Sequence, residues 1–401
     1  MTKELRMLEC RKIACGFQAV FVIIILLGVV VFSAVAAEAD TPGDAELAKL
    51  LETMRAVDKK GVGNEEAAKA WPRLAECNAK QLPAILAGMD HANPLAANWM
   101  RTAIETIYRR ELAAACGSKG FLPSKELERF VLNTSHAPHA RRLAYEWLIS
   151  QDPSARERII PKMLDDACLE MRRDAVARLI KQAEAAKDNK TKAIQTYKKA
   201  LAAAREEDQV KQITRQLKKL GIEINLPRYF GFIVNWQTAA PFDNTDGKGY
   251  NAVYGPEEQN DFSDAKKWKG KHGEVKVFDL AGEGDHARID FNKAYGEKKS
   301  VIAYARARFV SDSSRQVQFR LTTHNAFKVW LNGKFVCGYQ TYHDGGQFDH
   351  YICDATLQKG ENIILVKSCQ NALKQEWTRA WDFSLRVCDK LGGAILSTDR
   401  K

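Results

Sequence analysis

The sequence predicts a multidomain α + β protein: an N-terminal α-solenoid of helical hairpins, followed by an antiparallel β-sandwich or jelly roll. Its 401 residues exceed the usual size of a single domain, so we expect at least two cores. Apolar residues recur with the helical period between residues 44 and 220. After Pro227 the period changes to two, which is typical of strands that bury one face.

The composition is that of a globular protein, with 45% hydrophobic and 28% charged residues. The net charge of +11 comes from 61 basic and 50 acidic side chains. This surplus is spread along the chain, with +2 over residues 1–36, +5 over 37–227 and +4 over 228–401. Because a dedicated nucleic-acid binder concentrates its basic residues, we expect no nucleic-acid partner.

Residues 1–37 have the pattern of a signal peptide or an N-terminal membrane anchor. Four basic residues between Lys3 and Lys12 precede an apolar run that ends in Ala34-Val35-Ala36, a small-x-small cleavage pattern. About 20 apolar residues also suffice to span a bilayer, so cleavage near Ala36 and an uncleaved anchor both stay open. Either way the basic flank stays in the cytoplasm. We expect an exported protein that is periplasmic or extracellular after cleavage, or single-pass with its domains outside the cytoplasm. Membrane contact is confined to this segment.

Residues 41–222 form the predicted helical-repeat domain. Leu47, Leu50, Leu51 and Met54 fall on one helix face. Further amphipathic stretches follow, separated by short breaks that often contain Pro or Gly. These stretches are Glu65–Cys77, Pro94–Ala115, Ser124–Leu132, His139–Ser150, Ser154–Asp165, Cys168–Ala186, Lys190–Arg205 and Asp208–Leu220.

A weak internal repeat supports stacked helices, because Arg101, Arg142 and Arg173 are each followed within three residues by Ala. The segment Asp165–Val176 resembles the second-helix opening of HEAT repeats, and residues 190–220 resemble a tetratricopeptide (TPR) hairpin. The resemblance implies an α-solenoid, in which each hairpin buries its apolar face by stacking on its neighbours. It also implies a protein partner on the helices. A role only in spacing and capping the next domain stays open.

Residues 228–390 form the predicted β-sandwich. Val317, Phe319 and Leu321 alternate with polar residues, as in a strand with one buried face. Asn332-Gly333 is the dipeptide most typical of a tight hairpin turn. About nine strands fit into this region without intervening helices, which favours a sandwich or jelly roll.

The flanks of the sandwich are short. Phe230–Gln237 is the first expected strand, and residues 391–401 form a C-terminal tail. The connector 223–227 leaves little slack, so the helical domain and the sandwich are expected to pack together.

Four short motifs of the sandwich carry a family resemblance: Val329–Lys334, Gly345-Gly346, Asp354–Leu357 and Lys359–Val366. Together they resemble the sugar-binding jelly roll of family 2 glycoside hydrolases, a galactose-binding-like module. The resemblance implies the fold and a glycan on the sandwich, with a protein ligand as the alternative. The whole layout also resembles exported HEAT-repeat envelope proteins of bacteria, which implies a non-catalytic role.

We expect no enzymatic activity, no cofactor and no metal. The catalytic barrel of those hydrolases takes about 250 residues, and glycoside hydrolysis needs two carboxylates that face one cleft. No such pair stands out in the sandwich, and the sequence contains no P-loop, H-E-x-x-H or G-x-S-x-G motif. The alternatives are a glycan-processing enzyme or its accessory subunit, and a purely structural envelope component.

The candidate ligand-binding residues belong to one polar loop and two tryptophans. Sugar sites combine aromatic rings, which lie against the apolar faces of the sugar, with a few polar groups that hydrogen-bond its hydroxyls. The loop after Gly338 is rich in such side chains, and the two tryptophans lie among charged residues. The candidates are Trp268, Tyr342, His343, Asp344, Asp349 and Trp377.

The sandwich region also contains cysteines that are candidates for disulfides, since export permits disulfides. They are Cys337, Cys353, Cys369 and Cys388. Four cysteines allow three complete pairings, and the sequence does not choose among them.

Overall fold

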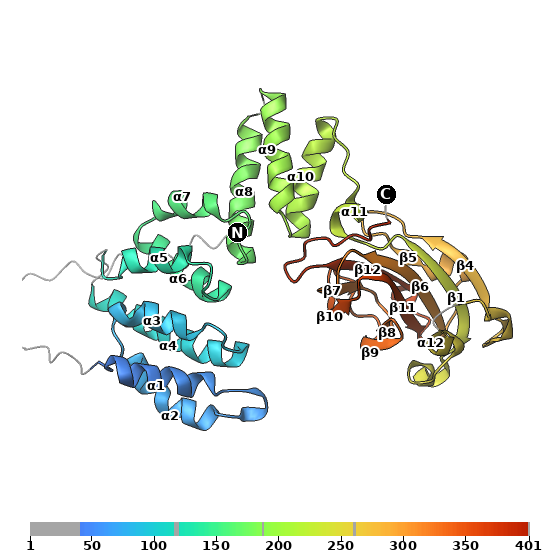
Figure 1. Ribbon diagram of the computed structural model, residues 1–401, viewed down its shortest axis with the longest axis horizontal. Coiled ribbons are helices and arrows are strands. Elements are labelled where there is room, and N and C mark those ends of the chain that lie inside the picture. Colours follow the sequence, from blue (N-terminus) through green and yellow to red (C-terminus); the bar gives the residue numbers. More distant parts are fainter. Residues whose placement is uncertain (1–40, 116–119, 187, 260–261, 400–401) are drawn as a thin grey trace, which may run out of the picture.

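The computed structural model describes residues 41–115, 120–186, 188–259 and 262–399 (Figure 1). The predicted signal peptide or membrane anchor at residues 1–37 lies outside these residues. Among the helices of the described ranges, none is long and apolar enough to cross a membrane. Helices occupy the N-terminal part and antiparallel strands the C-terminal part. The protein is therefore of the mixed α + β class, with a β-sandwich in its C-terminal region.

The helices of the N-terminal part pack on one another in chain order, from blue to green in Figure 1. Their bounds are α1 (Asp44–Arg55), α2 (Asn64–Ala75), α3 (Leu82–Gly88), α4 (Pro94–Ala114), α5 (Ser124–Leu132), α6 (Pro138–Gln151), α7 (Ala155–Ile159), α8 (Leu169–Ala185), α9 (Lys190–Ala203), α10 (Glu207–Lys219) and α11 (Leu226–Phe230).

Helix α4 shows why these segments are helical. Pro94 occupies the first turn, where its missing N–H is not needed. The side chain of Asn93 accepts hydrogen bonds from the N–H groups of Leu95 and Ala96, which caps the helix. One face of α4 is apolar and buried, as the packing of an amphipathic helix requires. Its buried residues are Ala96, Ala97, Met100, Ala103, Ile104 and Ile107.

The repeated arginines of the sequence contribute contacts between helices. Arg142 of α6 donates a hydrogen bond to Asp174 of α8 over 2.7 Å. Arg173 of α8 donates to Asp208 of α10 over the same distance. Arg101 instead pairs within α4. The same position of the repeat thus joins neighbouring helices in two of its three occurrences.

A buried ion pair holds the turn before α8. Arg141 of α6 is fully buried, and two of its nitrogens donate to the carboxylate of Asp166, each over 2.8 Å. The same carboxylate accepts from the N–H of Cys168 over 2.8 Å. Arg172 donates to the backbone carbonyl of Asp166 over 2.9 Å. Because a buried charge is costly unless it is paired, these contacts specify the entry into α8.

Two of the elements expected from the sequence are wrong. The expected helix Ser154–Asp165 ends early as α7, because Pro161 lacks the N–H that would continue the helix and a 3-10 turn follows. The expected strand Phe230–Gln237 starts as helix, since α11 ends at Phe230. Gly231 follows with φ 83°, and β1 begins only at Asn235.

The strands form two main antiparallel sheets and one small hairpin. The six-stranded sheet has the order β4-β1-β6-β11-β8-β9, the four-stranded sheet has the order β10-β7-β12-β5, and β2 pairs with β3. The bounds are β1 (Asn235–Asp243), β2 (Lys269–Gly270), β3 (Gly273–Glu274), β4 (Lys276–Ala281), β5 (Ile289–Asp290), β6 (Val301–Ser311), β7 (Arg315–Thr322), β8 (Ala326–Leu331), β9 (Lys334–Tyr339), β10 (Tyr351–Leu357), β11 (Gly360–Gln370) and β12 (Asp382–Cys388). Contrary to expectation, two short helices interrupt the strands, α12 (Gly255–Gln259) and α13 (Phe291–Tyr295).

The main core of the sandwich lies between the two sheets. Val317, Phe319 and Leu321 of β7 are buried in it, as their alternation with polar residues predicts. Asn332 and Gly333 join β8 to β9 with φ of 52° and 75°, the left-handed values that this hairpin turn requires. Sequence period and turn chemistry therefore agree with the sheet.

A second apolar layer covers the outer face of the six-stranded sheet. Phe242, Tyr304 and Trp330 belong to it, beneath the segment that links β1 to β4. Lys367 of β11 is fully buried under this segment and donates to the backbone carbonyl of Ala252 over 2.7 Å. It also pairs with Glu257 of α12 over 2.9 Å. These contacts satisfy the buried ammonium and hold α12 on the sheet.

The helices and the sandwich share an apolar cluster, so the two parts pack together. Leu201 of α9 and Leu217 of α10 belong to this cluster with Phe230 and Phe232. The hydroxyl of Tyr229 donates to the backbone carbonyl of Leu201 over 2.6 Å. Figure 1 shows α11 between α10 and the sheets.

Phe319→Ala tests the main core. Phe319 is fully buried, so we expect the substitution to lower the free energy of unfolding by about 3–5 kcal/mol. Phe335→Ala is the matched control, because Phe335 is 59% exposed and its loss should cost less than about 1 kcal/mol. Denaturant titration of both variants measures the difference. Equal losses would place Phe319 outside the core.

Candidate functional site

One end of the sandwich brings several loops together. Asp243 lies beside Val301, and Val301 lies beside Gln370, so β1 ends where β6 begins and β11 ends. Tyr339 opposes Phe327 near the start of β8, which places the end of β9 at the same end of the sandwich. The connection from β9 to β10 therefore meets the connection from β11 to β12 there.

Three of the six predicted site residues lie together at this end. Tyr342 and His343 follow β9, and Trp377 lies in a short 3-10 turn between β11 and β12. The rings of His343 and Trp377 are 5.1 Å apart and nearly perpendicular, and the rings of Tyr342 and His343 are 6.3 Å apart. Trp377 is 66% exposed, so its indole is open to a ligand. We call these three residues and the hollow beside them the loop-end site.

The hollow of the loop-end site has a volume of about 400 Å³. Polar and apolar side chains line it, among them Asn244, Tyr342, Asn371 and Leu373. The hydroxyl of Tyr342 accepts a hydrogen bond from the amide of Asn244 over 3.2 Å. The same amide donates to the backbone carbonyl of Gln370 over 3.0 Å, which holds it in place. The lining residues are thus mostly polar and include the exposed carboxylate of Asp246, with Leu373 and the ring of Tyr342 as apolar parts.

The backbone of His343 is constrained. Its φ is 62°, in the left-handed region that residues other than glycine rarely enter. Its N–H donates to the backbone carbonyl of His324 over 2.5 Å, which supports this conformation. Lys299 donates to the backbone carbonyl of Thr378 over 2.8 Å and so holds the turn that carries Trp377.

Burial sets the charge of this site. Desolvation lowers the pKa of His343 and raises the pKa of Tyr342, so both side chains are neutral near pH 7. Burial also lowers the pKa of Lys299. Tyr342 and His343 are therefore uncharged beside the open ring of Trp377, and both ring nitrogens of His343 are buried.

The two aspartates of the predicted loop lie apart from these residues. Asp344 is exposed, and its carboxylate accepts from the N–H of Gly345 over 2.8 Å. Asp349 accepts from Arg386 over 2.6 Å and from Arg320 over 2.9 Å. Arg386 is buried, so Asp349 neutralises an internal charge, and a ligand contact of Asp349 stays a prediction.

The bend at Gly345 explains why Asp349 lies away from the loop-end site. Gly345 has φ 87°, and a Cβ at this position would lie 2.8 Å from the backbone carbonyl oxygen of Thr323. Only glycine fits this close approach. The chain turns here from the loop-end site toward the four-stranded sheet.

Trp268 also lies apart from the other candidates, in the segment between β1 and β4. Its ring is half-buried and packs against Phe242, with 5.9 Å between ring centroids, and edge-on against Phe262, at 5.8 Å. It lines a hollow of its own on the outer face of the six-stranded sheet. Sequence reasoning placed Trp268 and Trp377 in one group, but Trp268 lines this hollow and Trp377 lies in the turn between β11 and β12.

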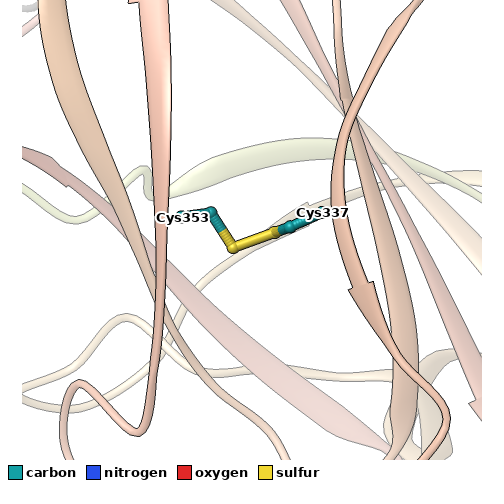
Figure 2. The surroundings of a disulfide bond; sticks show 2 residues. All are labelled: Cys337 and Cys353. Atoms are coloured by element: carbon teal, nitrogen blue, oxygen red, sulfur yellow. A yellow bond between two sulfur atoms is a disulfide. The ribbon is translucent and has the colours of Figure 1, made fainter. Parts of the chain in front are cut away.

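The sequence left open how four cysteines of the sandwich pair, and the structure contains one disulfide among them. Cys337 of β9 and Cys353 of β10 form a disulfide, with 6.1 Å between their Cα atoms (Figure 2). Since β9 and β10 belong to different sheets, this bond ties the sandwich together at its edge. Cys369 and Cys388 are buried free thiols, so their prediction as disulfide cysteines needs correction. Burial raises the pKa of Cys369 to about 12, which keeps it protonated.

The described ranges contain no cluster of three or more His, Cys, Asp or Glu side chains that could hold a metal ion. Sequence reasoning missed Asn244, Asn371 and Leu373 of the loop-end site. They come from two connections that are distant in sequence from Tyr342. The one sequence signal for this group was Leu373, an apolar residue within a polar stretch. In the structure its side chain is 42% exposed, as at a ligand-facing position.

No protein-family model matches the sequence, and no curated protein matches it either. Among solved structures, the β-glucosidase of Kluyveromyces marxianus in complex with glucose is similar over 38% of this chain, with 12% identity and a TM-score of 0.25. The chain spans 16% of the length of that enzyme.

Two smaller proteins are also similar. A family 35 carbohydrate-binding module from Clostridium thermocellum has 13% identity and a TM-score of 0.17, over 24% of this chain and 82% of the module. The epithelial adhesin 9 A domain of Candida glabrata, in complex with Galβ1-4GlcNAc, has 11% identity and a TM-score of 0.22, over 39% of this chain and 81% of the domain. At such scores the similarity establishes neither a family nor a ligand for this chain.

The two aspartates of the loop should differ in their effect on stability. Asp349→Ala leaves the buried guanidinium of Arg386 without its carboxylate, so we expect a loss of about 3 kcal/mol in the free energy of unfolding. Asp344→Ala removes an exposed side chain and should cost less than about 1 kcal/mol. Chemical denaturation compares the pair. An Asp349→Ala variant as stable as Asp344→Ala would contradict the structural role of Asp349.

The depressed pKa of His343 gives a direction for pH dependence. The unfolded chain takes up this proton at a higher pH than the folded chain, so stability falls as the pH drops from the ordinary histidine pKa toward the lower folded value. His343→Gln should therefore lose less stability between pH 7 and pH 5 than the parent protein. His350→Gln, at an exposed histidine, serves as the control. The measurement is the melting temperature of each variant between pH 5 and pH 7. If the melting temperatures of His343→Gln and the parent fall in parallel, the lowered pKa of His343 is refuted.

Proposed function

We propose that this protein is a non-catalytic, exported envelope protein whose sandwich binds a carbohydrate at the loop-end site. The observation that carries the proposal is the open indole of Trp377, set edge-on to the neutral ring of His343 beside a hollow with fixed amides. A sugar presents an apolar ring face and hydroxyl groups. Aromatic rings and uncharged polar groups are complementary to both.

Each residue has a distinct role in this proposal. Trp377 contacts the sugar face, and Tyr342 supplies hydrogen bonds from the hollow. The ring nitrogens of His343 are buried, so His343 supports the indole of Trp377 edge-on. Asp344 lies at the rim of the bend, and Asp349 supports the loop from behind. Trp268 belongs to an adjoining hollow.

The helices, residues 41–222 in this proposal, form an α-solenoid that presents a surface to a protein partner. The contacts of Arg142 and Arg173 with the following helices support regular stacking. A hollow of about 470 Å³ on α4, α6 and α8 supports a binding surface, since Asn98, Arg101 and His139 line it.

Export is part of the same proposal, with residues 1–37 as a signal peptide or membrane anchor. The disulfide between Cys337 and Cys353 supports it, because disulfides form and persist in oxidising compartments. The sandwich would then act in the periplasm, outside the cell or at the outer face of a membrane.

Trp377→Ala tests the carbohydrate site. We expect this variant of the chain without residues 1–36 to bind its glycan about tenfold more weakly, because stacking on an aromatic ring contributes about 1–1.5 kcal/mol. Phe335→Ala removes a similarly exposed ring on β9 and should bind normally. A glycan array identifies the ligand and titration calorimetry measures its affinity.

The outcomes separate the alternatives. Equal affinity of Trp377→Ala and the parent would remove the site from this loop. Binding to no glycan on the array would favour the purely structural role, and release of shorter sugars from the bound glycan would favour a glycan-processing enzyme.

A further inference from the structure

A second and larger hollow lies on the outer face of the six-stranded sheet, with a volume of about 780 Å³. Phe242, Tyr254 and Trp268 line it. The ring of Phe242 is 5.1 Å from that of Tyr254 and 5.9 Å from that of Trp268, and Phe262 packs edge-on against Trp268. Val253 adds an apolar rim that is 62% exposed. The aromatic wall is therefore held in place by packing.

Lysines surround this aromatic wall. The segment 264–276, which contains β2 and β3, has five lysines and two acidic residues. Lys267, Lys269 and Lys271 line the hollow. Lys271 is half-buried and pairs with Asp243 over 3.0 Å, so it belongs to the framework. We call this hollow the lysine-rimmed pocket.

The side chains of Lys267 and Lys269 are accessible to a ligand. Lys267 is exposed and pairs at the surface with Asp264 over 2.9 Å, a contact that contributes little in water. Lys269 is exposed and makes no ion pair with any part of the chain that the structure describes. Glu258 adds one acidic side chain to the lining. The rim therefore presents two accessible ammonium groups beside aromatic rings.

We infer that the lysine-rimmed pocket binds an acidic sugar unit, with the aromatic wall against the sugar ring and the ammonium groups of Lys267 and Lys269 paired with its anionic group. Carboxylated and sulfated sugars share this chemistry. The inference rests on the proposed sugar-binding function of the sandwich and adds the charge class of the ligand.

The two hollows adjoin each other. Asp243 lines the lysine-rimmed pocket, and the next residue, Asn244, lines the loop-end site. Lys271 of the pocket donates to the backbone carbonyl of Ser300 over 2.6 Å, and Ser300 lines the loop-end site. Asp243-Asn244 and the contact between Lys271 and Ser300 thus lie between the two hollows, and we expect a chain of several sugar units to reach both.

The arrangement favours an acidic glycan over a nucleic acid. A single strand of nucleic acid needs a basic groove that follows its backbone, with aromatic rings for successive bases. Here the accessible lysines belong to one short segment, and the adjoining loop-end site presents the neutral Tyr342 and the carboxylate of Asp246, which repels phosphates. A glycan with an anionic unit next to uncharged, hydroxyl-rich units matches the lysine-rimmed pocket and the loop-end site together.

The test titrates the chain without residues 1–36 with hexasaccharides of galacturonate, mannuronate and glucuronate, each beside its methyl ester. A sulfated neutral hexasaccharide and a single-stranded oligonucleotide complete the set. We expect one uronate or the sulfated sugar to bind at least about tenfold more tightly than its uncharged counterpart, because two ammonium–anion contacts are lost in the latter. Added salt should reduce the difference in affinity between the charged sugar and its uncharged counterpart.

The variant Lys267→Ala/Lys269→Ala should lose this preference and keep its affinity for the uncharged sugar. Lys334→Ala/Lys359→Ala is the matched control. Both lysines are exposed at the opposite end of the sandwich, Lys334 as the first residue of β9 and Lys359 just before β11. An acidic sugar that binds no better than its uncharged form would overturn the inference. So would unchanged binding by the first double variant, or an oligonucleotide that binds more tightly than every sugar. If uncharged sugars bind and Trp377→Ala weakens that binding, the loop-end site is supported even when acidic sugars show no preference. The two proposals can therefore fail separately.

Discussion

The buried guanidinium of Arg386 is the contact on which several parts of the structure depend. It pairs with Asp349 of the connection between β9 and β10, and it donates to the backbone carbonyls of Phe230 and Gly392, each over 3.1 Å. It also lies 4.8 Å from the centre of the Phe348 ring. One side chain of β12 thereby joins the site loop, the junction with the helices and the C-terminal tail. Since a buried charge must be paired, these segments are fixed relative to the sheet.

The second constraint is the burial of the six-stranded sheet on both faces. Its inner face contributes Val366 to the main core, and its outer face contributes Leu365 to the layer that contains Phe242. Covering the outer face requires the long segment between β1 and β4, and Lys367 holds that segment through Glu257. The same segment supplies Trp268 and the lysines beside it, so the material that shields the sheet also forms a pocket.

Sugar recognition in this proposal depends on local charge as much as on aromatic rings. At the loop-end site burial removes the charge of His343, whereas the rim of the neighbouring pocket keeps exposed lysines such as Lys269. Counting charge over 228–401 hides this contrast, because the surplus there is only +4. The distinction between a neutral and a basic subsite is thus a property of exposure, which composition does not report.

The sequence by itself determined the class of the protein and the elements whose patterns are local. The alternation of Val317, Phe319 and Leu321 specifies a strand with one buried face, and Asn332-Gly333 specifies the tight hairpin between β8 and β9. Both patterns are local, because side-chain period and backbone φ act over a few residues. The helix over Pro94–Ala114 follows from its cap and its apolar face in the same way.

Only the tertiary structure decided which polar residues face a ligand and which cysteines pair. His343 and Trp377 meet because β9 and β11 finish at the same end of the sandwich, a proximity set by strand order and register. Asp349 looked like a ligand residue, but it neutralises Arg386, and sequence does not reveal which charges are buried together. Cys337 pairs with Cys353 because β9 and β10, the outermost strands of the two sheets, lie side by side. Contacts between distant segments depend on how the sheets close on each other, which no local pattern encodes.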